Sequence, residues 1–176
     1  MKMYYLDNKK STIRWDRNVN ETKLRGQVNF SKGYFISELD KLLEGSAVID
    51  LRTIVVDGVS GQEKDEIEEH LKSANFLDVH QYPLATYKFD SVYDVGEGKE
   101  IRGMLLFKDM AFHLTIPVEI SQGGNTFSAS SEFSVKRLSP MLFDVLTESD
   151  DPMEEKLHTL EICLTVFAEE RETGNK

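Results

Sequence analysis

Apolar and polar residues alternate along most of this chain, and the alternation is clearest in the segment from Met110 to Ile120. Every second residue there is large and apolar, whereas the residues between them are small, polar or proline. Successive side chains of a β-strand point to opposite faces, so this period of two residues predicts a strand with one buried face. The apolar face of the segment consists of Phe112, Leu114, Ile116, Val118 and Ile120.

Seven further segments show the same alternation, which raises the expected number of strands to eight. Two glycine-containing segments, Gly96 to Gly98 and Gly123 to Asn125, separate neighbouring strand patterns and suit hairpin turns. Strands of about 9–11 residues are roughly 30–36 Å long, which favours a tall closed barrel over a small sandwich. The eight expected strands run from Ser11 to Asp16, Leu24 to Phe30, Ala47 to Val55, Ala85 to Tyr93, Glu100 to Phe107, Met110 to Ile120, Thr126 to Val135 and Leu157 to Ala168.

One segment between the third and fourth of these strands has a helical pattern instead. Ser60 to Glu63 fits a capping box, and Ile67 and Leu71 then lie four residues apart in a charged stretch. We therefore expect a short helix from Gln62 to Ser73, with an ion pair between Glu68 and Lys72. The predicted fold class is all-β, an eight-stranded antiparallel barrel with this helix inserted between the third and fourth long strands.

The length and composition are those of a single domain, which we expect to cover residues 1–176. The segment from Ser139 to Glu155 contains two prolines and several acidic residues, and it is expected to be a long loop. The net charge of −10 would repel phosphate backbones, so nucleic acid is not an expected partner. Because no apolar stretch approaches about 20 residues and the N-terminal residues do not resemble a secretory signal, we expect no transmembrane segment and a cytoplasmic location.

The sequence contains no recognisable catalytic or metal-binding motif. The histidines, His70, His80, His113 and His158, are not spaced as metal ligands, and Cys163 is the only cysteine. A single cysteine excludes an internal disulfide, and no nucleophile elbow or phosphate-binding loop is present. We therefore expect neither enzymatic activity nor a metal site.

The segment from His70 to Phe89 resembles the YceI-like family of lipocalin-like, polyisoprenoid-binding proteins. Supporting matches outside this block are the first expected strand from Ser11 to Trp15, Gly26, Gly103 with Lys108, the sequence Ile116 to Val118, and Arg137. The residues of the block that occupy the family's positions are Leu71, Ser73, Phe76, Asp78, Val79, Tyr82, Pro83 and Thr86.

The chain also departs from the family pattern at several positions. Leu77 replaces a usual second phenylalanine, and Asp109 stands where a turn glycine is common. No histidine follows Trp15, and the residues after Arg137 lack the usual aspartate, aromatic and glycine sequence. These departures affect the identity of a ligand more than the expected fold.

The resemblance implies an elongated, often dimeric barrel whose lumen encloses an isoprenoid chain, such as that of a quinone-like lipid, and many relatives are exported. We therefore expect an apolar small-molecule ligand of this kind, a homodimer, and no other cofactor. The residues expected to line the lumen all lie on the alternating apolar faces. They are Val28, Phe30, Ile49, Leu51, Tyr87, Phe89, Phe112, Leu114, Ile116, Phe127 and Phe133.

Two alternatives remain open from the sequence alone. An eight-stranded barrel can be filled by its own side chains, and alternation is the same in filled and ligand-holding barrels. The chain would then be a ligand-free interaction or stress-response module, with the acidic helix and the segment from Ser139 to Glu155 as its contact surface. The other alternative is an enzyme acting on a lipid in the lumen, with Tyr87, Arg52 and His80 meeting at the barrel mouth.

Overall fold

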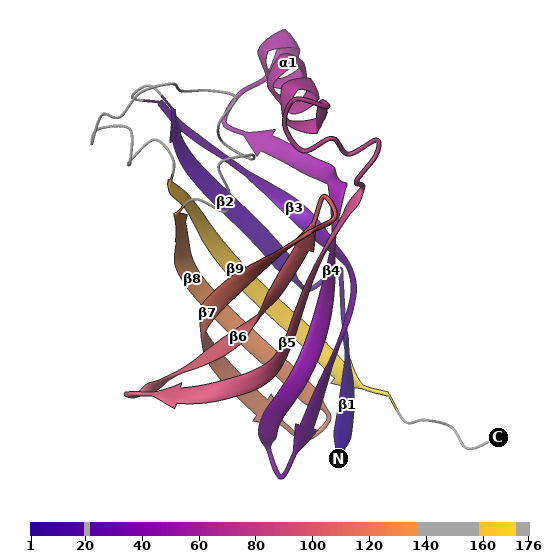
Figure 1. Cartoon of the computed structure of the whole chain (residues 1–176), viewed down its shortest axis with the longest axis vertical. Helices are drawn as coiled ribbons and strands as arrows, with labels where there is room; N and C mark the ends of the chain where they lie inside the picture. Colours follow the sequence, from indigo (N-terminus) through magenta and orange to yellow (C-terminus); the bar gives the residue numbers. More distant parts are fainter. Residues whose placement is uncertain (20–21, 137–158, 172–176) are drawn as a thin grey trace, which may run out of the picture.

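The computed structural model of the chain describes residues 1–19, 22–136 and 159–171. Within these ranges the chain forms nine β-strands and one α-helix, as Figure 1 shows. The elements are β1 (Lys2–Leu6), β2 (Thr12–Val19), β3 (Thr22–Glu38), β4 (Lys41–Asp57), α1 (Gly61–Lys72), β5 (Leu84–Val95), β6 (Gly98–Phe107), β7 (Met110–Gly123), β8 (Thr126–Lys136) and β9 (Thr159–Glu170).

Eight of the described strands, β2 to β9, close into an antiparallel barrel. Consecutive strands pair along the sheet, β2 pairs with β9, and the β3–β4 pairing completes the circle. These eight strands are the eight that the alternation predicts, so the predicted fold class is confirmed. The short strand β1 was not predicted. It pairs with both β3 and β9 near one end of the barrel, and only Tyr4 and Leu6 of its five residues are buried.

The strands β3 and β4 are 17 residues long, which is longer than the sequence pattern predicts. Phe30 and Phe35 of β3 are both buried although they are five positions apart, so they cannot share a face in a regular strand. The register between β3 and β4 shifts between Phe30 and Lys32. This bulge turns the side chain of Phe35 back toward the interior of the barrel. The prediction ended β3 at Phe30 because the alternation is interrupted at this bulge.

The helix α1 lies at the upper end of the barrel in Figure 1, above the end of β4. Leu71 is its buried residue, and the carboxylate of Glu68 accepts a hydrogen bond of 3.0 Å from the backbone N–H of Val56. Glu68 also lies 3.7 Å from Lys64, one turn earlier. The predicted partner of Glu68, Lys72, was therefore wrong. β4 has no β5 partner beyond Asp50, so the carboxylate satisfies an N–H on an open strand edge.

The segment after α1, residues 73–83, forms a compact lid over the same end of the barrel. The carbonyl of Ser73 accepts hydrogen bonds from the N–H groups of Phe76 and Asp78, and Asp78 has a φ of 51°. The Lys108 ammonium, in the β6–β7 turn, donates to the carbonyl of Phe76. The lid is thus tied to the barrel wall by residues that the family resemblance singled out.

Candidate ligand-binding lumen

The interior of the barrel holds one large apolar cluster with an aromatic centre. Phe35 and Phe127 stack with ring centroids 5.0 Å apart, and Tyr4 and Phe89 lie beside them at 5.9 Å and 6.5 Å. These rings come from β1, β3, β5 and β8, strands on different sides of the barrel. The aromatic residues therefore fill the middle of the lumen rather than only its wall.

All eleven residues predicted to line the lumen are at least partly buried. Seven are buried, and Ile49, Phe112, Leu114 and Phe133 are partly buried against a core cluster. Leu51 and Phe112 belong only to a smaller cluster with Ala85, Phe107 and residues of the lid, whereas Ile49 contacts both clusters. The buried seven are Val28, Phe30, Leu51, Tyr87, Phe89, Ile116 and Phe127.

A cavity of about 50 Å³ lies in the half of the barrel away from α1. Three predicted residues, Phe89, Ile116 and Phe127, contribute to its wall, and the surface that it exposes is apolar. The other ten lining residues were not among the eleven predicted site residues, and two of them, Phe35 and Leu42, lie beyond the predicted ends of β3 and β4. The other lining residues are Ile101, Val118, Ile120, Ala129, Ser130, Ser131, Leu164 and Val166.

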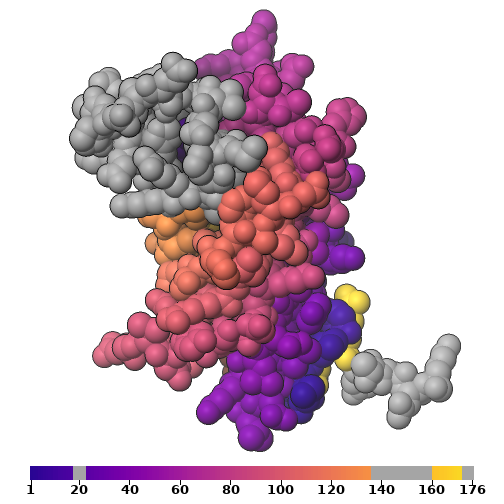
Figure 2. All heavy atoms as spheres, viewed as in Figure 1, coloured from indigo at the N-terminus to yellow at the C-terminus, as the bar shows by residue number. Residues whose placement is uncertain are grey.

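The size of this cavity limits what it holds without rearrangement. Pockets for small-molecule ligands usually measure about 300–1,000 Å³, so 50 Å³ holds a small group and not a lipid. A long chain enters only when rings such as Phe89 and Phe127 move aside. In Figure 2 the atoms of β5, β6 and β7 form a continuous wall on the face of the barrel that is turned toward the viewer.

Tyr87 places a hydroxyl inside the apolar wall. The hydroxyl donates a hydrogen bond of 2.8 Å to the carbonyl of Leu114 on β7, two strands away. Burial raises the pKa of the Tyr87 phenol well above its ordinary value. The hydroxyl therefore stays protonated as a structural donor that links β5 to β7 across the intervening strand.

Replacing Tyr87 by phenylalanine is expected to lower the free energy of unfolding at neutral pH by about 1 kcal/mol, because the hydrogen bond to Leu114 is lost. The raised pKa stabilises the native fold below about pH 10, and this contribution disappears as the pH rises above that value. Urea unfolding from about pH 7 to pH 11 should therefore show a weaker alkaline loss of stability in the variant. Equal slopes for both proteins above pH 10 would contradict this assignment.

The groups proposed for catalysis do not meet. Tyr87 is bonded to the barrel wall, while Arg52 is exposed and pairs with Asp50 at 2.8 Å. His80 is exposed, and Cys163 lies on the outer face of β9 with its sulfur 3.9 Å from a carboxylate oxygen of Glu132. Among residues 1–19, 22–136 and 159–171, no three His, Cys, Asp or Glu residues are grouped closely enough to hold a metal ion.

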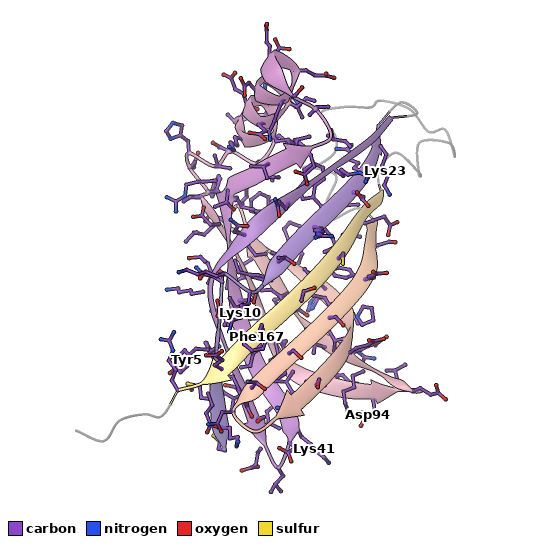
Figure 3. The ribbon with its side chains drawn as sticks, turned by 180° about the vertical axis from the view of Figure 1, so that it is seen from behind. Tyr5, Lys10, Lys23, Lys41, Asp94 and Phe167 are labelled. Atoms are coloured by element: carbon purple, nitrogen blue, oxygen red, sulfur yellow. The ribbon has the colours of Figure 1, made fainter. Side chains whose placement is uncertain are left out.

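Lys10 and Phe167 form a cation–π contact on the outer face of the barrel. Figure 3 shows Lys10 beside Phe167, with the ammonium 4.5 Å from the ring centroid. Lys10 also pairs with Glu169 at 2.9 Å.

In the part of the chain that the structure describes, no helix is long and apolar enough to cross a membrane. The segment predicted as a loop, Ser139 to Glu155, lies outside the described residues.

Comparisons with known proteins agree with this geometry. A UPF0312 protein of Vibrio cholerae serotype O1 is 26% identical over 125 residues, or 69% of this chain and 64% of that protein. The chain thus spans less than two thirds of that curated relative. The crystal structure of Burkholderia cenocepacia BcnA superposes with a TM-score of 0.71 at 18% identity, covering 92% of this chain and 98% of that chain.

The Campylobacter jejuni YCEI protein gives a TM-score of 0.58 at 15% identity, covering 82% of this chain and 85% of that chain. At these identities the two crystal structures show that the fold is shared. The YceI-like domain itself matches residues 4–145, which include the barrel wall from β1 to β8 and the lid. The chain therefore belongs to the YceI-like family.

Proposed function

We propose that this protein binds a long apolar molecule, an isoprenoid or quinone-like lipid, inside the barrel and carries or sequesters it. The observation that carries the proposal is the apolar cavity lined by Phe35, Phe89 and Phe127 on the inner side of the barrel. Apolar chains need few polar contacts, because each buried methylene contributes about 0.8 kcal/mol. The YceI-like barrel is a fold that commonly binds apolar ligands, which supports the same role.

The ligand in this proposal is in contact with the eleven residues predicted from the alternation, together with Phe35 and Leu42. Binding moves the rings that now fill the lumen, so the affinity depends on how easily the aromatic cluster rearranges. The single domain over residues 1–176, the homodimer, the cytoplasmic location and the absence of enzymatic activity stay predictions from the sequence.

A second candidate function is favoured by the small volume of the cavity. A lumen filled by Phe35, Phe89 and Phe127 with 50 Å³ of free space also suits a barrel that binds nothing inside. The protein would then act through its surface as an interaction or stress-response module. The two functions differ in one observable, the presence of ligand in the lumen.

The test is organic extraction of denatured protein, purified from its native host, followed by mass spectrometry. An extract of the same protein washed with detergent before denaturation provides the blank. A prenyl-chain or acyl lipid at about one molecule per chain supports the carrier function and identifies its cargo. A clean extract, together with no uptake of an added isoprenoid quinone, contradicts the carrier function and favours the interaction module.

A further inference from the structure

The ladder between β7 and β8 is the shortest in the wall of the barrel. It joins five residue pairs at the end away from α1, whereas β6 and β7 share nine pairs and β8 and β9 share eleven. Among the described residues, 110–118 of β7 and 131–136 of β8 thus have no strand partner on each other. We call this unpaired stretch the β7–β8 seam. Figure 1 shows the two strands diverging along it toward the α1 end.

Pro117 explains why the ladder ends where it does. The hydroxyl of Ser131 donates a hydrogen bond to the carbonyl of Pro117, so this carbonyl faces β8. The N–H and C=O of one strand residue point to the same side, so the proline nitrogen, which carries no hydrogen, also faces β8. The next hydrogen-bonded pair of the ladder would need this missing donor. The sequence itself therefore keeps the seam unpaired.

The inward side chains at the seam are apolar and incompletely covered. Leu114 of β7 and Phe133 of β8 pack against the core cluster, yet both are only partly buried. Ile116, Val118 and Ser131, at the lower end of the seam, line the cavity. A ligand chain that passes between Leu114 and Phe133 therefore reaches the cavity along apolar side chains.

The ladder between β4 and β5 is also short, but packing closes it at both ends. Toward α1 the lid continues it, because the N–H of Leu51 donates to the carbonyl of Pro83 at 2.9 Å. Away from α1 the ladder ends at Gly45 and Phe89. An added Cβ on Gly45 would lie 2.7 Å from ring atoms of both Phe35 and Phe89. Parting these strands thus displaces the lid or the aromatic cluster.

We propose that a long apolar ligand enters and leaves the lumen sideways, through the β7–β8 seam. Widening the seam breaks the hydrogen bond between Ser131 and Pro117. Parting any other two neighbouring strands of the wall breaks a backbone ladder of at least six residue pairs. The inference rests on the proposed function and deepens it by naming the route of the ligand.

The experiment measures exchange of a short-chain isoprenoid quinone in the full-length chain, with Trp15 as the reporter. Trp15 is the only tryptophan and is buried. It is in register with Ile162, whose partner on β8 is Phe133 at the seam. A quinone bound beside an indole quenches its fluorescence. Stopped-flow mixing with the quinone gives the uptake rate, and mixing loaded protein with excess phosphatidylcholine vesicles gives the release rate.

A reversible cross-link tests the route. Thr115→Cys combined with Ser134→Cys places thiols on the two sides of the seam, at exposed positions of the outer face. The background is Cys163→Ser, because Cys163 is the only native cysteine. The shortest reducible bis-thiosulfonate that joins both thiols closes the seam. The matched control is Ser134→Cys with Glu161→Cys, because these exposed residues already face each other across the β8–β9 ladder.

We expect the seam cross-link to slow uptake and release about tenfold or more each. The dissociation constant should change by less than about twofold, because a closed route slows both directions alike. Reduction of the linker should restore both rates, and the control cross-link should leave them unchanged. Mass spectrometry and thermal unfolding establish that each protein is cross-linked and folded.

The outcomes separate this inference from the proposed function. Unchanged exchange in the seam-linked protein, or equal slowing by the control cross-link, would show that the ligand uses another route, while the carrier function stands. If the quinone does not bind to the native chain at all, the carrier function and the route are both overturned.

Discussion

Replacing Gly103 by alanine is expected to lower the free energy of unfolding by about 3 kcal/mol, the upper end of the usual cost of overpacking. A Cβ at this position of β6 would overlap the carbonyl oxygen of Lys88 on β5. It would also lie 2.9 Å from Cβ of Phe89 and 2.9 Å from Cζ of Tyr87. Neither a strand backbone nor a buried ring beside the aromatic cluster can shift without widening the barrel.

Urea unfolding of the native chain and of the Gly103→Ala variant measures this difference. Gly98→Ala is the matched control in the same strand, because its Cβ would meet only the carbonyl oxygen of Val95 at 3.8 Å. The control should change stability by less than about 1 kcal/mol, and a small gain is expected from the reduced entropy of the unfolded chain. Equal stabilities of the two variants would show that close β5–β6 packing is not required at Gly103.

The alternation was sufficient to predict the wall of the barrel. All eight expected strands exist, because residues such as Ile116 and Val118 bury one face of a strand and leave the other in water. The helix was predicted within one residue of its ends, from a capping pattern and the spacing of Ile67 and Leu71. These features depend on local sequence, so the local pattern contains enough information to find them.

The features that the alternation could not predict depend on contacts between distant segments. Phe35 and Leu42 line the cavity beyond bulges in the β3–β4 register, and a bulge reverses the face without any local signal. Glu68 binds Val56 instead of Lys72 because the edge of β4 is open beside the helix. Alternation also shows which residues of a strand face the interior, but it does not show at what height along the barrel axis each residue lies. Leu51 therefore packs under the lid although Phe89 lies at the cavity.

One departure from the family pattern has a direct structural explanation. Asp109 stands in the β6–β7 turn where a glycine is common, and its φ is 58°. Aspartate tolerates this left-handed conformation better than most residues, so the turn keeps its shape at small cost. Lys108, its neighbour in the turn, has a φ of 49° and donates to Phe76 of the lid. The substitution thus leaves the connection between turn and lid in place.

Replacing Ala129 by leucine is expected to weaken the binding of a long apolar ligand at least about tenfold while leaving the protein as stable as the native chain or more stable. Ala129 lies on the inward face of β8 and lines the cavity. The larger side chain would occupy the 50 Å³ of free space that is open to a ligand chain in this half of the barrel. Filling an apolar void contributes up to about 0.8 kcal/mol for each methylene that is well packed.

The measurement combines calorimetric titration of hexadecanoate with thermal unfolding of the ligand-free variant. Ala111→Leu is the control, because Ala111 is exposed on the outer face of β7 and the change leaves the lumen untouched. Loss of binding without loss of stability places the ligand chain in the cavity half of the barrel. Unchanged binding in the Ala129 variant would mean that the ligand occupies another part of the molecule. The cavity would then be a packing defect among aromatic side chains.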